Sequence, residues 1–114
     1  MDIDSETEKK IQELQLIEQN LQALLMQKQS IQLEANEAAS AILELKKTSD
    51  EVYRIIGGIM VKSEKSVLLS ELEEKNKIFE LRVSTLEKQE KISGEKAEKL
   101  KKSISDVLSG IKRH

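Results

Sequence analysis

Two long segments of this 114-residue chain carry apolar residues at alternating spacings of three and four. In the first segment nine of ten such positions are apolar: Leu14, Ile17, Leu21, Leu24, Lys28, Ile31, Ala35, Ala38, Ile42 and Leu45. In the second, ten of thirteen are apolar: Leu69, Leu72, Asn76, Phe79, Val83, Leu86, Glu90, Ser93, Ala97, Leu100, Ile104, Val107 and Ile111. This spacing is typical of a coiled-coil seam, in which one lysine, here Lys28, fixes the register at some cost in stability.

The two segments predict two long helices, over residues 5–47 and about 66–111. The chain has no proline, and residues 5–47 also lack glycine, so nothing breaks the first helix. Ser5, with Glu8 three places later, matches a capping box at its start, and Ser63 or Ser66 could cap the second helix. Charged residues make up 35% of the chain and aromatic residues only 2%, so a compact globular core is not expected.

Between the helices the pattern changes to two short runs rich in β-branched residues. The runs 52–56 (Val-Tyr-Arg-Ile-Ile) and 59–62 (Ile-Met-Val-Lys) flank Gly57 and Gly58. Two glycines between such runs are typical of a hairpin with a two-residue primed turn. We therefore expect one β-hairpin over about residues 52–62 in a fold that is otherwise α-helical.

This hairpin is best interpreted as an assembly device. An isolated two-stranded hairpin is marginally stable in water, and its unpaired edges invite pairing with other chains. The alternative is a turn that packs only on its own helices. We favour assembly, because two helices are too thin to cover so apolar a ribbon.

The helices are expected to pair antiparallel, with facing residue numbers that sum to about 114. Ala35 then faces Phe79, and Leu14 faces Leu100. Beyond that point the apolar residues of the second helix have little apolar partner on the first, because Ile104, Val107, Leu108 and Ile111 face Lys10, Thr7, Glu6 and Ile3. Such a stripe usually marks a binding surface, although it could also pair with another chain or stay solvated at a frayed end. Further apolar residues off the seam are Leu16, Leu25, Met26 and Leu33.

Several classes of protein are disfavoured by what the chain lacks. It has no cysteine, and its one histidine, His114, is the last residue, so no disulfide, metal or other cofactor is expected. Carboxylates such as Glu71, Glu73 and Glu74 lie beside lysines on solvated helix faces, which argues against an enzyme. No apolar run approaches the ~20 residues of a membrane span, and the first residues are acidic. We therefore expect a soluble, cytoplasmic protein without a membrane partner.

A basic patch near the C-terminus comprises Lys99, Lys101, Lys102, Lys112 and Arg113. The patch has no interleaved aromatic residues, and the formal net charge of the chain is −2, so a nucleic-acid partner is not expected. The same lysines could instead meet an acidic protein surface, where they would speed encounter and set specificity.

Three strings in the chain resemble the prefoldin beta subunit of archaeal type. They are the hairpin string 52–62 (VYRIIGGIMVK), the string 81–90 (LRVSTLEKQE) and the run 22–29 (QALLMQKQ) in the first helix. The resemblance covers nearly the whole chain as a single domain, 1–114, and agrees with its length and its one hairpin.

The resemblance implies a hexamer of two alpha and four beta subunits, whose hairpins form an oligomeric β-barrel body. It implies an ATP-independent chaperone that captures unfolded polypeptides at the coiled-coil tips and passes them to a group II chaperonin. By position, the assembly residues would be Val52, Tyr53, Ile55, Ile56, Gly57, Gly58, Ile59 and Val61. The client-binding tip would hold Ile3, Leu100, Ile104, Val107, Leu108 and Ile111. The alternative function is a structural coiled-coil spacer or scaffold that binds no client.

Overall fold

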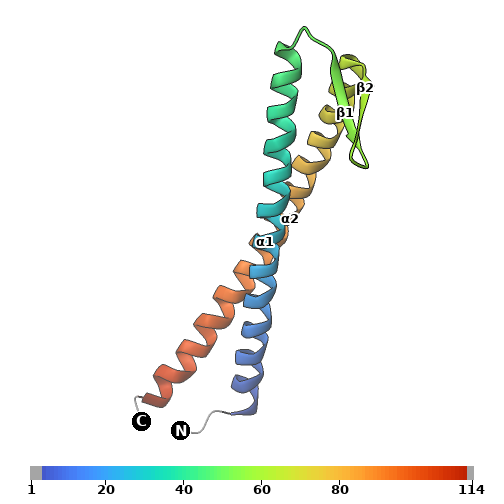
Figure 1. Ribbon diagram of the computed structural model, residues 1–114. Helices are drawn as coiled ribbons and strands as arrows, with labels where there is room; N and C mark the ends of the chain where they lie inside the picture. Colours follow the sequence, from blue (N-terminus) through green and yellow to red (C-terminus); the bar gives the residue numbers. More distant parts are fainter. Residues whose placement is uncertain (1–3, 113–114) are drawn as a thin grey trace. The chain divides into compact units, whose positions relative to one another are not determined.

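The computed structural model describes the backbone of residues 4–112 and the side chains of residues 4–110. In chain order it contains α1 (Ser5–Lys47), β1 (Val52–Ile56), β2 (Ile59–Ser63) and α2 (Lys65–Lys112), as Figure 1 shows. These elements confirm the predicted fold class of two long helices joined by one β-hairpin. The chain forms two compact units, of which unit 1 contains the described residues up to Lys28 and from Thr85 onward, and unit 2 contains Gln29–Ser84.

The residue that caps α1 differs from the expected one. The backbone N–H of Thr7 donates to Asp4 Oδ1 at 2.7 Å, and that of Glu8 donates to the Asp4 carbonyl at 3.1 Å. Asp4 is therefore the N-cap, and the prediction that Ser5 caps the helix is wrong by one position. Hydrogen bonds from the Thr7 side chain and then its backbone lower the pKa of the Asp4 carboxyl, which also suits a negative charge at a helix N-terminus.

Burial follows the predicted seams of both helices. All the buried apolar side chains among the described residues occupy seam positions, and they are Leu24, Ile31, Ala38, Ile42, Leu86, Ala97 and Ile104. Within each unit, segments of α1 and α2 run in opposite directions, so each seam faces the other helix. The apolar core is therefore a narrow strip between two helices, and the remaining faces are solvated, as in a coiled coil.

A lysine of α2 completes the C-terminal end of α1 within unit 2. Lys65 Nζ donates to the carbonyl oxygen of Thr48 at 2.9 Å and reaches that of Lys46 at 3.5 Å. The last carbonyls of a helix lack partners within it and carry its negative dipole end, so a cation there is stabilising. α2 itself begins at Lys65, one residue earlier than expected, and within the described structure neither Ser63 nor Ser66 makes a side-chain cap.

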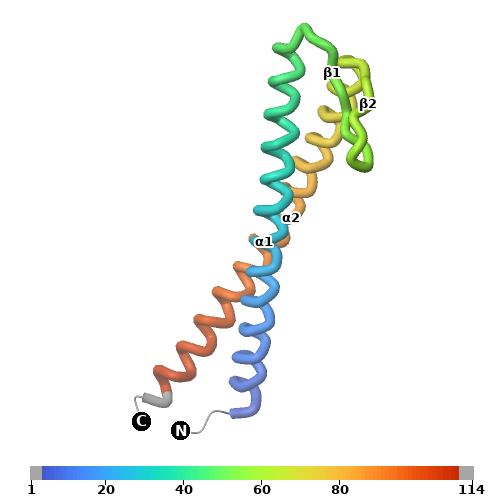
Figure 2. The backbone as a smooth tube through the Cα atoms, in the orientation of Figure 1, coloured from blue at the N-terminus to red at the C-terminus, as the bar shows by residue number. Residues whose placement is uncertain are grey.

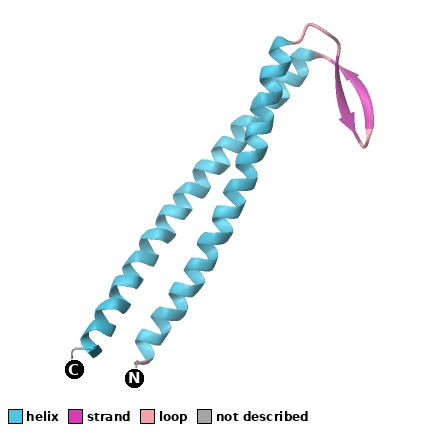
Figure 3. Cartoon of the chain, turned by 60° about the vertical axis from the view of Figure 1, so that its left-hand side comes forward, coloured by secondary structure: helices cyan, strands magenta, loops and turns pink. Residues whose placement is uncertain are grey.

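The hairpin leaves α1 and returns to α2 within unit 2, as the backbone trace in Figure 2 shows. Its strands lie to one side of the two helix segments rather than between them (Figure 3). One flank of the ribbon is therefore close to the helices, while the rest faces away from them.

Candidate functional site

The hairpin has the tight turn that its glycine pair predicts. Gly57 and Gly58 have φ values of +55° and +80°, the left-handed conformation that both central residues of a type I′ turn require. The ladder runs from Ile56 opposite Ile59 to Val52 opposite Ser63, so β2 extends one residue beyond the predicted end. A side chain at either glycine would meet no neighbouring atom within 4 Å, so only the backbone conformation demands glycine here.

Apolar side chains of the hairpin are exposed on both of its faces. The exposed members are Tyr53, Ile55, Ile56, Ile59, Met60 and Val61. Ile55 and Met60 lie opposite each other across the ladder and are 72% and 68% exposed. Two strands supply only one ladder, so each strand also keeps an unpaired edge. Such a surface is typical of one that another chain covers.

An ion pair ties the hairpin to α2. The Arg54 guanidinium pairs with the Glu71 carboxylate, which places the face that contains Arg54 toward the helices. A groove of about 490 Å³ follows this contact, lined by Ala41, Leu45, Tyr53, Arg54, Ile55, Ile56, Leu68, Glu71, Leu72 and Lys75. Glu71 is exposed, as expected for a solvated helix face, and it also has a partner in Arg54 that the sequence did not reveal. The pair is partly exposed, with side chains 33% and 47% exposed, so its contribution to stability is small, about 0–1 kcal/mol.

The opposite face of the hairpin carries a small polar cluster around Glu51. The Tyr53 hydroxyl donates to Glu51 Oε2 at 2.7 Å, and Lys62 Nζ lies 3.1 Å from Glu51 Oε1. The hydrogen bond from Tyr53, followed by that from Lys62, lowers the pKa of the Glu51 carboxyl. The same hydroxyl-to-carboxylate bond raises the pKa of Tyr53, because it favours the protonated phenol.

Titration of Tyr53 is expected to report this cluster directly. Tyr53 is the only tyrosine and the chain has no tryptophan, so the absorbance change near 295 nm comes from one group. We expect the pKa of Tyr53 to lie above the ordinary value of about 10. The Glu51→Gln substitution is expected to lower this pKa. The Tyr53 contribution to stability is present below pH 10 and lost as pH rises through the raised pKa, whereas that of Glu51 is lost in acid. An unchanged pKa in the glutamine variant would contradict the contact.

The predicted client-binding tip lies in unit 1 and is more covered than expected. Ile104 is only 8% exposed, and Leu100, Val107 and Leu108 are half-buried, whereas Ile3 and the Ile111 side chain lie outside the described residues. Thr7 is 2% exposed, and Lys10 Nζ donates to Ser103 Oγ at 2.8 Å. The α1 residues expected to leave the stripe open thus help to cover it, and the expectation of an uncovered stripe is wrong for Ile104.

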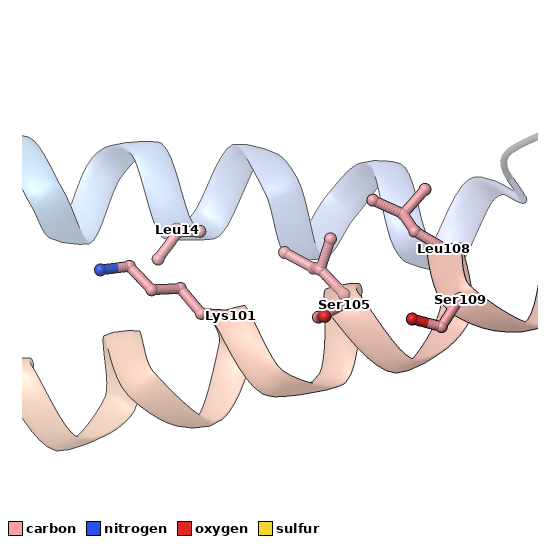
Figure 4. A pocket seen from close by; sticks show the side chains of 6 residues that line it. Leu14, Lys101, Ser105, Leu108 and Ser109 are labelled. Carbon is pink, nitrogen blue, oxygen red and sulfur yellow. The ribbon is translucent and has the colours of Figure 1, made fainter.

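A groove remains open beside Ile104. It has a volume of about 310 Å³ and is lined by Leu14, Lys101, Ile104, Ser105, Leu108 and Ser109. Figure 4 shows Leu14 of α1 opposite a row of α2 side chains that runs from Lys101 to Ser109. The apolar part combines the two helices, and the polar part comes from α2 alone. The four off-seam residues Leu16, Leu25, Met26 and Leu33 are also exposed, but they do not line this groove.

Two polar residues of the seams form an ion pair in unit 1. Lys28 Nζ lies 3.0 Å from Glu90 Oε2, with side chains 22% and 29% exposed. The sequence shows each residue as a separate interruption of its heptad pattern. Their numbers sum to 118 rather than 114, so they meet one helical turn away from the assumed register.

No metal-binding cluster occurs among the described residues. Within residues 4–112, no group of three histidine, cysteine or carboxylate side chains could hold a metal ion. As far as the structure describes them, neither helix has an apolar stretch that would allow it to cross a membrane. The described features with potential for binding are thus the exposed hairpin of unit 2 and the groove of unit 1.

Comparison with known proteins identifies the family. A family model described as prefoldin subunit matches residues 8–110. The chain belongs to the prefoldin family. Its curated relatives include beta subunits, and prefoldin subunit beta of Methanospirillum hungatei is 37% identical over 112 residues, covering 96% of this chain and 93% of that protein. Prefoldin subunit beta of Thermococcus onnurineus is 38% identical over 98 residues, 84% of each chain.

A solved prefoldin structure has the same fold. The crystal structure of the prefoldin beta subunit from Thermococcus strain KS-1 is 34% identical and aligns with a TM-score of 0.87, over 94% of this chain and 96% of that one. Prefoldin family members are chaperone subunits and not enzymes, which agrees with the lack of a catalytic signal in the sequence. The prefoldin resemblance of the three sequence strings is thereby confirmed.

Several residues of these sites were not identified from the sequence of this prefoldin chain. They are Glu51, Glu71, Ser105 and Ser109. One signal for Glu71 was available, because Arg54 is a lone charge within an apolar strand and needs a partner near the face it occupies. The groove residues gave no comparable signal, since serines on a charged helix face are common.

Proposed function

We propose that this chain is a beta subunit of a cytoplasmic, ATP-independent chaperone that captures unfolded polypeptides. Four copies would assemble with two alpha subunits through their hairpins into a β-barrel body. The observation that carries the proposal is the exposed apolar hairpin of a chain that belongs to the prefoldin family. Ile55, at 72% exposure, would become buried in such an assembly, and burying apolar area is the main driving force of association.

Clients would bind at the end of unit 1, where Leu14, Ile104 and Leu108 surround the groove. A single groove of this size offers little affinity, but several copies on one hexamer would hold a long polypeptide at many points. Linked weak sites raise the effective concentration of each next contact, so strength does not require a deep pocket. Transfer to a group II chaperonin would follow, with the exposed Lys99 and Lys102 available to an acidic surface.

Truncation of residues 100–114 tests the client-binding part of the proposal. The hairpin lies in unit 2, which the truncation does not touch, so the mass of the mixture with alpha subunit is expected to stay that of a hexamer. Suppression of client aggregation, measured by light scattering, is expected to fall to the level without chaperone. Protection by the truncated assembly equal to that by the intact one would refute binding at this end and favour a structural spacer.

A point variant separates the groove from the folded end as a whole. Leu108→Ser removes one apolar wall of the groove, and we expect weaker protection of clients with an unchanged hexamer mass. Leu16→Ser is the matched control, because Leu16 belongs to the same unit, is 66% exposed and does not line the groove. If both variants lose protection equally, the groove is not the site.

A further inference from the structure

The groove in unit 1 has a polar row and an apolar row that run side by side along α2. Lys101, Ser105 and Ser109 are spaced four residues apart, and so are Ile104 and Leu108. Residues four apart lie on the same face of a helix, one turn above another. Figure 4 shows the labelled side chains in this order along α2, with Leu14 opposite them. A ligand along the groove would therefore meet one polar and one apolar group at every turn.

The polar row offers hydrogen-bond donors that are not all paired within the described residues. Within the part of the chain that the structure describes, the hydroxyls of Ser105 and Ser109 make no hydrogen bond. Lys101 has only an exposed contact with Glu98 at 3.5 Å, which leaves donor capacity. The nearby Ser103 differs, because its hydroxyl accepts a hydrogen bond from Lys10. No acidic side chain lines the groove, so its charge favours acceptors such as backbone carbonyls.

The spacing of these rows matches an extended polypeptide. Four residues of a helix rise ~6.0 Å, and two residues of an extended chain rise roughly 6.6–6.8 Å, the distance between side chains or carbonyls on the same side. The two spacings differ by about 0.7 Å at each step. Over the three donors this difference is small enough for the rotatable serine hydroxyls and the long lysine side chain to accommodate. A helical ligand would not fit as well, because its carbonyls are already bonded within the helix.

We propose that this groove binds its client as an extended segment along α2, with alternate apolar side chains against Leu14, Ile104 and Leu108. The backbone carbonyls of the segment accept hydrogen bonds from Lys101, Ser105 and Ser109. This inference rests on the proposed chaperone function and specifies the conformation that the site recognises. It gives a reason for broad client choice, because every polypeptide has the same carbonyls and only the apolar alternation is selected.

Binding of fluorescent peptides to the full-length chain tests the proposal. One probe is a nine-residue peptide that alternates leucine with threonine, and the second has the same composition in an order with leucines at helical spacing. We expect the alternating peptide to bind more tightly in fluorescence anisotropy. Ser105→Ala with Ser109→Ala is expected to weaken it about tenfold, as for the loss of two hydrogen bonds. Replacing the contacted amides of the peptide by esters, which are weaker acceptors, is expected to weaken it similarly.

Matched variants separate a failure of the hydrogen-bonded binding mode from a failure of the client site itself. Ser70→Ala with Ser84→Ala changes two exposed serines of α2 that lie in unit 2, and we expect unchanged binding. If Leu108→Ser weakens binding but the Ser105/Ser109 double variant does not, the hydrogen-bonded extended mode is wrong while the client site stands. If neither variant matters, the proposed client site fails as well. A dimer of the chain that forms in solution and is lost in the Leu108→Ser variant would show that a second copy occupies the groove. That result would also overturn the proposal.

Discussion

Replacing Ile55 and Met60 by lysine is expected to abolish assembly and leave the separate chain folded. The two residues are partners across the hairpin and are highly exposed in the single chain, so lysine costs little there. In the proposed assembly they would be covered, and burying an ammonium group costs several kcal/mol. We expect association with alpha subunit to weaken by on the order of a thousandfold or more. Native mass measurement of the mixture should then show the 13.0 kDa chain alone.

The control for this experiment is Leu16→Lys together with Met26→Lys. Both residues are exposed to a similar degree, at 66% and 65%, but they lie on α1 in unit 1. The charge added is the same, so a loss of assembly in this variant as well would indicate a general effect of charge. Unchanged circular dichroism of the hairpin variant would show that its helices persist. A hexamer that still forms with lysines at 55 and 60 would refute assembly through this face of the hairpin.

The seam and the hairpin were predictable because each depends on local, repetitive rules. A spacing of three and four fixes which side of a helix is apolar, whatever lies opposite. Two adjacent glycines between β-branched runs fix a primed turn, because both positions need a positive φ. Among the described residues the buried apolar side chains occupy the predicted seam positions without exception.

Features that depend on how the helices align were not predictable in the same way. The assumed sum of 114 placed Lys28 and Glu90 apart, yet long side chains reach one turn along the seam and pair. Ile104 was expected to lack cover, but Thr7 is buried in the same unit and Lys10 reaches across to Ser103. A heptad pattern does not predict contacts between residues of two helices that are offset along the seam. It also does not distinguish a capping Ser5 from the neighbouring Asp4, since both residue types cap helices well.

The groove illustrates a second limit of pattern reasoning. Leu14 and Ile104 were identified as seam residues and Leu108 as part of the apolar stripe, whereas the two serines are ordinary members of a solvated face. Only the structure places them along one opening beside Leu14. The proposed client site is therefore made from the edge of a seam and requires no residue of special chemistry.

The ion pair between Lys28 and Glu90 is expected to be worth more than any exposed pair of the helices. Glu90→Ala would leave the Lys28 ammonium in the seam without its partner, and we expect the free energy of unfolding to fall by about 1–2 kcal/mol, less than for a fully buried pair. Glu98→Ala is the matched control, because Glu98 pairs with Lys101 at an exposed site, and its effect should stay below about 0.5 kcal/mol. Urea denaturation at a fixed chain concentration measures both.

Replacing Lys28 and Glu90 together by leucine should raise the free energy of unfolding above that of the natural chain. The two substitutions complete the apolar seam and remove the desolvation of two charges, which is how apolar replacements of ion pairs stabilise proteins. The same change removes the contact that fixes the helix register, so we expect broader lines for unit 1 in nuclear magnetic resonance spectra. A double leucine variant that is less stable than Glu90→Ala would show that the pair is a net source of stability and not a device for alignment.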